Sequence, residues 1–195
     1  MPKVGMRPIR RKQLVEAAIA TIHQHGFASA TVARIARTAG VSSGIVHHYF
    51  ADKDELLFAT IWELLAELRR DTVDRQREAR TPRERVNAII NASFSDKQFD
   101  GQVFSAWLAL YGNARQSERL KRILKLYHRR LHANLMAELS KFMDRKSSAK
   151  LAEGIGAMID GLWLRYALTG KPENPEHPRA ITRSYFEAAA GFDHL

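Results

Sequence analysis

A short run of hydroxyl and imidazole side chains carries the clearest chemistry in this sequence. It consists of Ser42, Ser43, His47 and His48. Hydroxyls and neutral imidazoles both donate and accept hydrogen bonds, so they can meet base edges and phosphate oxygens of a duplex. We therefore expect these four side chains to face double-stranded DNA.

Positive charge is concentrated around this run. Residues 1–50 hold seven Lys or Arg and one acid, Glu16, whereas the rest of the chain holds 24 Lys or Arg and 20 acids. Cations near phosphates release condensed counterions and so gain affinity for a polyanion, although a solvated basic face is the alternative. The arm from Lys3 to Lys12 is a candidate for phosphates or the minor groove. Within and beyond this arm, the individual candidates are Arg10, Arg11, Thr31, Arg34, Tyr49 and Lys53.

Aromatic residues and one acid in the C-terminal part suggest a second kind of site. A quaternary ammonium donates no ordinary hydrogen bond and is held best by aromatic faces with an acid nearby. Asp160 and Trp163 are spaced to share a helix face, and Trp107 and Tyr111 are further candidates. Asp160 lies in an apolar stretch, so it needs either a cationic partner such as an Arg or a ligand cation. Packing in the core is the alternative for each of the four.

An enzyme is the alternative class of protein, and the eight histidines of the sequence are the residues that would best support it. His128 and His132, four residues apart on a helix rich in Arg, are spaced to bind a metal ion. No HExxH pattern, nucleophile motif or glycine-rich phosphate loop accompanies them. We expect no catalytic residue, no metal site and no cofactor beyond a small-molecule effector.

The segments that must position these residues all have helical periodicity, which predicts an all-α fold. A first helix over 7–25 is expected to end at Gly26, and Thr31 is expected to cap a short helix that Gly40 closes. Ser42 or Ser43 is expected to cap a second short helix over 43–49. Two short helices with a glycine turn between them have the geometry of a helix-turn-helix, although an αα-hairpin of a bundle would show the same apolar seam.

Longer helices follow. Asp52 is expected to cap a helix over 53–80 that links the two halves of the chain. We predict a DNA-binding domain over 1–52 and a ligand-binding and dimerisation domain over 53–195. The remaining helices are expected over 82–97, 100–112, 117–143, 148–169 and 178–190.

One helix-turn-helix reads only half a site, so we expect a homodimer on a near-palindromic operator. The last two helices are the expected seam. Ala152, Ile155, Ile159, Leu162 and Tyr166 follow one another at helical spacing there, and Ile181, Tyr185 and Phe186 could complete the interface. Gly154, Gly156 and Gly161 would let two backbones approach closely, and packing inside one protomer is the alternative.

The composition favours a cytoplasmic protein. The sequence has no cysteine, which fits a reducing compartment and excludes disulfides. No apolar run reaches the length of about 18 residues that a membrane span needs, and no apolar segment follows the basic start. We expect a chain that is neither exported nor membrane-bound.

The stretch from Thr31 to Leu57, which ends in HYFADKDELL, resembles the DNA-binding region of the TetR family. The segments MPKVGMRPIRRKQLVEA, AGVSSGIVHHYF, AWLALYG and IDGLWLRYALTGKP narrow the resemblance to choline-responsive repressors of the glycine betaine synthesis genes. That resemblance implies repression of a choline-to-betaine operon, relieved by choline under osmotic stress. A regulator of the same family that answers another ligand, such as a cationic drug or an acyl compound, is the alternative.

The sequence departs from the general family pattern at one place. An aromatic residue often stands early in the recognition helix of the family, and this chain has His47 there. We therefore expect Tyr49, rather than position 47, to make the phosphate contact.

Overall fold

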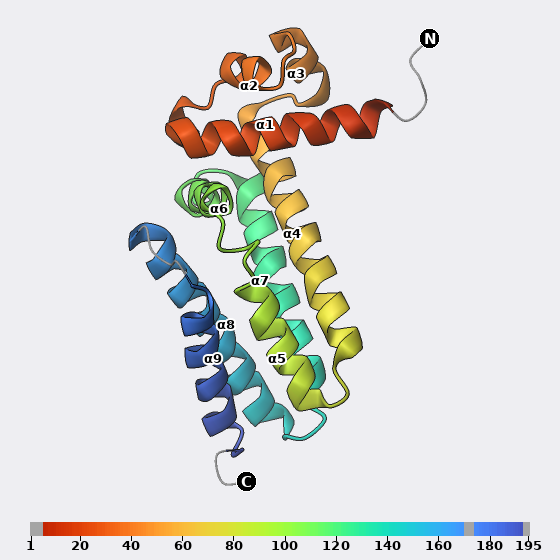
Figure 1. The fold of residues 1–195 in the computed structure, drawn as a ribbon, viewed down its shortest axis with the longest axis vertical. Helices are drawn as coiled ribbons and strands as arrows, with labels where there is room; N and C mark the ends of the chain where they lie inside the picture. The colour runs from red at the N-terminus through yellow and green to blue at the C-terminus, as the bar shows by residue number, and fades with distance from the viewer. Residues whose placement is uncertain (1–5, 170–173, 193–195) are drawn as a thin grey trace. The chain divides into compact units, whose positions relative to one another are not determined.

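The computed structural model describes residues 6–169 and 174–192. Over these residues the chain forms helices joined by turns, which confirms the expected all-α class (Figure 1). The helices are α1 (Met6–Ser29), α2 (Val32–Thr38), α3 (Ser43–Tyr49), α4 (Lys53–Glu78), α5 (Pro82–Ser93), α6 (Gly101–Asn113), α7 (Glu118–Leu139), α8 (Arg145–Thr169) and α9 (Glu176–Ala189). None of the described helices is long and apolar enough to cross a membrane.

Contacts within the chain divide it into two compact units. The first unit takes the described residues up to Leu64 together with Gly101–Leu124. The second takes Leu65–Asp100 and the described residues from Lys125 onward. Helices α4 and α7 contribute to both. The functional division at residue 52 that the sequence suggests stays a prediction.

In the first unit, α1 packs against α2 and α6, and α2 packs against α3. Gly26 has φ 72 and ψ 159, so the regular path of α1 breaks at the glycine that was expected to end it. Gly40, with φ 66, closes α2 as predicted. Ile35 and Val46 are almost fully buried, which fixes the crossing of α2 and α3.

The start of α4 also follows the sequence. The Asp52 carboxylate accepts a hydrogen bond from the Glu55 backbone N–H at 2.6 Å, so the predicted cap is confirmed. The same carboxylate pairs with Arg119 at 3.0 Å. This cap fixes the point at which α4 leaves the helix-turn-helix.

In the second unit, α9 packs against both α5 and α8. Helix α5 begins with a capping box, in which Thr81 and Glu84 each accept from the other's backbone N–H, and Pro82 follows the cap. The prediction that this helix reaches residue 97 was wrong, because it ends at Ser93. Phe94 leaves the helical path and is fully buried, with its ring 5.8 Å from that of Phe99.

The other helix ends differ by a few residues from those predicted. Helix α7 ends at Leu139 rather than 143, because the residues after it form a turn. Helix α8 begins at Arg145 rather than 148, since the Asp144 carboxylate accepts from the N–H groups of Lys146 and Ser147. Hydrogen bonds from the Ser147 side chain and from the backbone N–H groups of Ser147 and Lys146 hold the pKa of Asp144 below its usual value.

Most residues of the helical face that was expected to form the dimer interface are buried within a single protomer. Ala152, Ile155, Ile159 and Leu162 are all buried within this single chain, as is Phe186 of α9. The prediction that these residues meet a second copy was therefore wrong. Gly154 also makes a contact inside the protomer, because a Cβ at this position would overlap the Tyr185 hydroxyl of α9.

Candidate nucleic-acid interface and ligand pockets

Helix α3 presents its polar side chains to solvent. Ser43, His47 and His48 are exposed, whereas Val46 on the opposite side is 1% exposed and holds α3 against α2. This outward orientation is the one that the sequence predicts for a base-reading helix. Tyr49 is half-buried, and its ring meets the edge of the His48 ring at a centroid distance of 5.4 Å.

Ser42 stands at the N-cap position of α3 but makes no side-chain cap hydrogen bond. Its backbone carbonyl accepts from the Ile45 N–H at 3.0 Å instead. The expectation that a serine hydroxyl caps this helix was therefore wrong. Since the Ser42 hydroxyl is exposed and not engaged in a cap, it can bond an incoming duplex.

Thr31 and Arg34, at the start of α2, are exposed and bonded locally. The Thr31 hydroxyl accepts from the Arg34 backbone N–H at 3.3 Å, so Thr31 is the predicted cap. One Arg34 guanidinium nitrogen donates to the Ser29 carbonyl at 3.2 Å. A guanidinium carries five N–H donors, so Arg34 retains donors for a phosphate.

Lys53 connects the start of α4 with the last turn of α1. Its ammonium donates to the Ala28 carbonyl at 3.0 Å and lies 4.2 Å from the centroid of the Phe27 ring. Partial burial lowers the pKa of Lys53. An ammonium has three N–H donors, and the bond to Ala28 uses one of them, so Lys53 can still donate to a phosphate. The expected phosphate contact stays a prediction.

The described part of the basic arm lies on α1. Arg10 donates to the Gln13 side chain at 3.0 Å, and the Arg11 guanidinium lies 5.3 Å from the centroid of the Phe50 ring. Lys3 lies outside the described residues. Arg11 is therefore packed on the helix-turn-helix core, whereas the bond of Arg10 is to the next turn of its own helix.

The four residues proposed for a ligand fall in different units. Trp107 and Tyr111 lie on α6 in the first unit with their ring centroids 6.1 Å apart, and Trp107 is buried. Asp160 and Trp163 lie on α8 in the second unit. Trp163 is buried and donates its indole N–H to the Gln98 carbonyl at 3.3 Å.

Asp160 has two partners on α7. Its carboxylate accepts from the Tyr127 hydroxyl at 2.9 Å and lies 3.1 Å from the His128 imidazole. The hydrogen bond to Asp160 raises the pKa of His128, against the opposing effect of burial. The cationic partner expected for Asp160 is therefore a histidine, which the sequence did not indicate because the pair is 32 residues apart.

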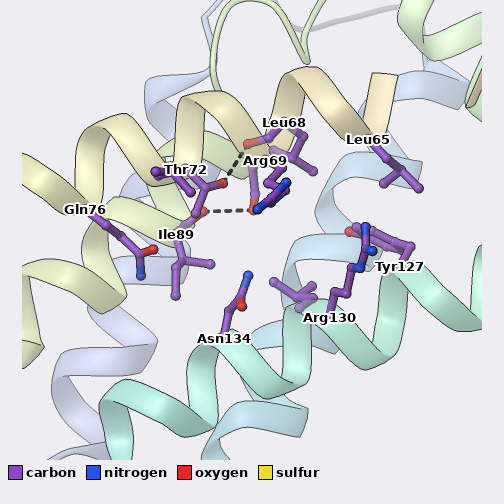
Figure 2. Close-up of a pocket in the computed structure, with 12 residues that line it drawn as sticks. Leu65, Leu68, Arg69, Thr72, Gln76, Ile89, Tyr127, Arg130 and Asn134 are labelled. Carbon is purple, nitrogen blue, oxygen red and sulfur yellow. Dashed lines mark hydrogen bonds between the residues drawn. The ribbon is translucent and has the colours of Figure 1, made fainter. Parts of the chain in front are cut away.

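Described residues of the second unit line a smaller and a larger pocket. The smaller, of about 240 Å³, lies between α7 and α8 beside Asp160, with His132 and Glu153 also in its lining. The larger, of about 540 Å³, lies between α4, α5 and α7 (Figure 2). Arg69 and Arg130 line the larger pocket, and sequence analysis missed both because they stand among many other exposed cations on their helices.

A helix-turn-helix at the start of an all-helical chain, with pockets in the helices that follow, defines a ligand-controlled type of DNA-binding regulator. Two family comparisons agree with this class. Residues 14–60 match the bacterial regulatory proteins of the tetR family, and residues 82–191 match the C-terminal region of BetI-type transcriptional repressors. The chain belongs to the TetR family, as a BetI-type transcriptional repressor.

Individual relatives support the same assignment. The chain is 46% identical to the HTH-type transcriptional regulator BetI of Agrobacterium fabrum, over 96% of this chain and 91% of that one. A transcriptional regulator from Pseudomonas aeruginosa PAO1 has the same fold, with a TM-score of 0.83 and 27% identity over 96% of this chain and 93% of that one. A regulator from Saccharomonospora viridis, solved in complex with choline, has a TM-score of 0.78 at 20% identity over 91% and 95% of the two chains.

Proposed function

We propose that this repressor binds a near-palindromic operator as a homodimer in the cytoplasm, with α3 of each protomer in the major groove, and that choline releases it. The genes it represses are those for synthesis of glycine betaine from choline. One observation carries the DNA-binding geometry: α3 exposes Ser43, His47 and His48 while Val46 anchors its back. Base edges lie within reach of such a face when the helix enters the major groove.

Phosphate contacts position the helix. The candidates for these contacts are Thr31 and Arg34 at the start of α2, Tyr49 at the end of α3, Lys53 at the start of α4, and Arg10 and Arg11 on α1. Each phosphate neutralised by a Lys or Arg contributes about −0.9 to the slope of log affinity against log salt. Arg34→Gln is therefore expected to flatten that slope by about two units for a dimer, one contact from each protomer.

The dimer is supported by an apolar face that one protomer leaves uncovered. On α8 this face consists of Ala157, Gly161, Leu164 and Leu168, and Leu168 is 67% exposed. Helix α9 adds small side chains and one large one, Ala180, Ile181, Ser184 and Ala188. Nothing among the described residues would meet a Cβ at Gly161, so this position can approach a second backbone closely.

The choline response is supported by the BetI-type C-terminal match and by the choline complex of a regulator with the same fold. Within this chain, Asp160 and Glu153 place two carboxylates at the smaller pocket. Carboxylates favour a cation there over a neutral or anionic ligand. Trp163, the other candidate on α8, does not line this pocket, so its contact with a ligand stays a prediction.

Ligand binding would act on DNA through α4. This helix begins at Lys53, directly after the helix-turn-helix, and contributes to both compact units of the chain. A ligand that favours one placement of α4 changes the spacing of the two recognition helices in a dimer. A hundredfold loss of operator affinity requires about 2.7 kcal/mol of coupling.

Calorimetry with choline, betaine aldehyde and glycine betaine, followed by a gel shift on the promoter beside the repressor's own gene, tests the proposal. Choline is expected to bind and to release the DNA. Equal operator affinity with and without choline, together with no heat of choline binding, would refute the choline assignment. Binding of a cationic drug or an acyl compound in place of choline would favour the alternative effector.

A further inference from the structure

The larger pocket of the second unit has the chemistry of an anion site. Its volume of about 540 Å³ lies in the range of small-molecule pockets. Leu65, Ile89 and Leu131 are buried and give it an apolar floor. Arg69 and Arg130 are exposed at its edge, and no Asp or Glu is among its lining residues. Two cations without an acid disfavour a quaternary ammonium in this pocket.

Polar groups point into this space from two helices. Figure 2 shows Arg69 and Gln76 of α4 on one side and Arg130 and Asn134 of α7 on the other. Arg69 makes no hydrogen bond or ion pair with any residue that the structure describes, and the same holds for the amides of Gln76 and Asn134. Their donors are available to a ligand.

The hydroxyl groups in the pocket are committed to the backbone. Thr72 donates to the Leu68 carbonyl at 2.8 Å, and Ser93 donates to the Ile89 carbonyl at 2.9 Å. Because each hydroxyl already donates its proton, it can only accept a further hydrogen bond and cannot donate to an anion. The donors for an anion are therefore the N–H groups of the guanidinium and amide side chains. A guanidinium can bind a carboxylate through two parallel N–H bonds, which makes such contacts strong and directional.

We propose that the pocket between α4, α5 and α7 binds a small organic carboxylate. Arg69 and Arg130 hold the carboxylate, and the apolar body of the ligand lies on Leu65, Ile89 and Leu131. Of its lining residues, only Leu131 also lines the smaller pocket beside Asp160, and the proposal does not depend on the choline response. It gives the repressor a second ligand of opposite charge.

Four probes separate the contributions of charge and apolar surface in calorimetry of the full chain. Sodium octanoate has a carboxylate and an apolar alkyl tail, and 1-octanol has the alkyl tail without the charge. Inorganic phosphate is an anion without an alkyl tail, and choline chloride supplies a cation. Octanoate is expected to bind most tightly, and excess choline is expected to leave its affinity unchanged. Arg69→Gln and Arg130→Gln are each expected to weaken octanoate binding by about 10- to 100-fold, as for the loss of a charged hydrogen bond.

Arg129→Gln is the matched control, because Arg129 neighbours Arg130 on α7, is exposed and does not line the pocket. It should bind octanoate as the parent does. Thermal melting of each variant checks the fold, and if Arg130→Gln is unfolded, Arg69→Gln decides the result alone. Absence of octanoate binding, equal binding of octanol, or equal losses in Arg69→Gln and Arg129→Gln would overturn the carboxylate site. Choline binding without octanoate binding would leave the effector assignment intact, and the reverse result would leave only the carboxylate site.

Discussion

Ser42 and Thr31 occupy the same position relative to their helices, but their hydroxyls have different partners. Thr31 caps α2, whereas Ser42 makes no cap bond with α3. We predict that Thr31→Ala lowers the free energy of unfolding by about 1 kcal/mol, the cost of a lost N-cap. Ser42→Ala should leave that free energy unchanged and weaken operator binding by about 5- to 30-fold, as for a lost hydrogen bond to the duplex.

Urea denaturation and fluorescence anisotropy on labelled operator measure the two quantities separately. Thr31→Ala provides the comparison, since its loss of DNA affinity should be accompanied by a loss of stability. If Ser42→Ala destabilised the protein as much as Thr31→Ala, the Ser42 hydroxyl would have a structural role in solution and the assignment to DNA would be wrong.

The His128–Asp160 pair makes stability depend on pH in a stated direction. The hydrogen bond to Asp160 raises the pKa of His128 above its value in the unfolded chain, which is about 6.5. The folded state therefore binds this proton more tightly. The resulting stabilisation is fully present below the unfolded pKa and is lost as the pH rises through the higher folded pKa.

We predict that Asp160→Asn lowers the pKa of His128, because an amide supplies no charge to favour the imidazolium. The Cε1 proton of His128 in an NMR titration reports this pKa directly. The stability difference between parent and Asp160→Asn should be larger at pH 5.5 than at pH 8.5, as follows from the linkage of pKa and folding. An unchanged His128 titration in Asp160→Asn would show that the pair does not form in solution.

At the level of helices, Gly154 decides how closely α8 and α9 pack. A Cβ at this position would overlap the Tyr185 hydroxyl and crowd the ring. We predict that Gly154→Ala destabilises the protein by about 1–3 kcal/mol, the usual cost of overpacking. In a Tyr185→Leu background the clash is absent, so the same substitution should be neutral or should stabilise α8 by up to about 1 kcal/mol through helix propensity.

A double-mutant cycle by chemical denaturation yields the coupling between the two positions. The coupling should be favourable to the double mutant and about as large as the cost of Gly154→Ala alone. Additive effects of the two substitutions would mean that Tyr185 does not pack over Gly154.

Local signals in the sequence were sufficient for the helix-turn-helix. Gly26, Thr31, Gly40 and Asp52 each act on their own neighbours, and the structure confirms all four as chain breaks or caps. The end of α5 was harder to predict, because Phe94 leaves the helix to be buried against Phe99. The burial of Phe94 depends on tertiary packing, and helical periodicity in the sequence does not predict tertiary packing.

The candidate sites show the same division. The exposed face of α3 could be read from one helix, since Val46 marks its buried side. The partners of Asp160 lie on α7, and the two arginines of the larger pocket lie on α4 and α7. Such pairs depend on which helices become neighbours, so residue types and spacing within one helix could not identify them.

At the scale of the whole molecule, the proposed dimer would bring two recognition helices together through the uncovered faces of α8 and α9. Large apolar side chains are costly to leave in water, and Leu164, Leu168 and Ile181 are all more than one third exposed in a single protomer. Small residues beside them allow close packing of helices. A second copy is the partner that would also give a repressor its second helix-turn-helix.

We predict that the double substitution Leu164→Glu and Leu168→Glu yields a folded monomer, because both side chains are exposed and the new charges would be buried only in a dimer. Light scattering coupled to size-exclusion chromatography measures the mass. Operator affinity should fall by at least about 100-fold, since the second half-site is no longer bound through a tethered partner.

Trp62→Glu is the control, because Trp62 is also an exposed large apolar residue but lies on α4. A double variant that remained dimeric would place the interface on another surface, and a parent protein that was monomeric at the concentration of the binding assay would exclude paired recognition helices.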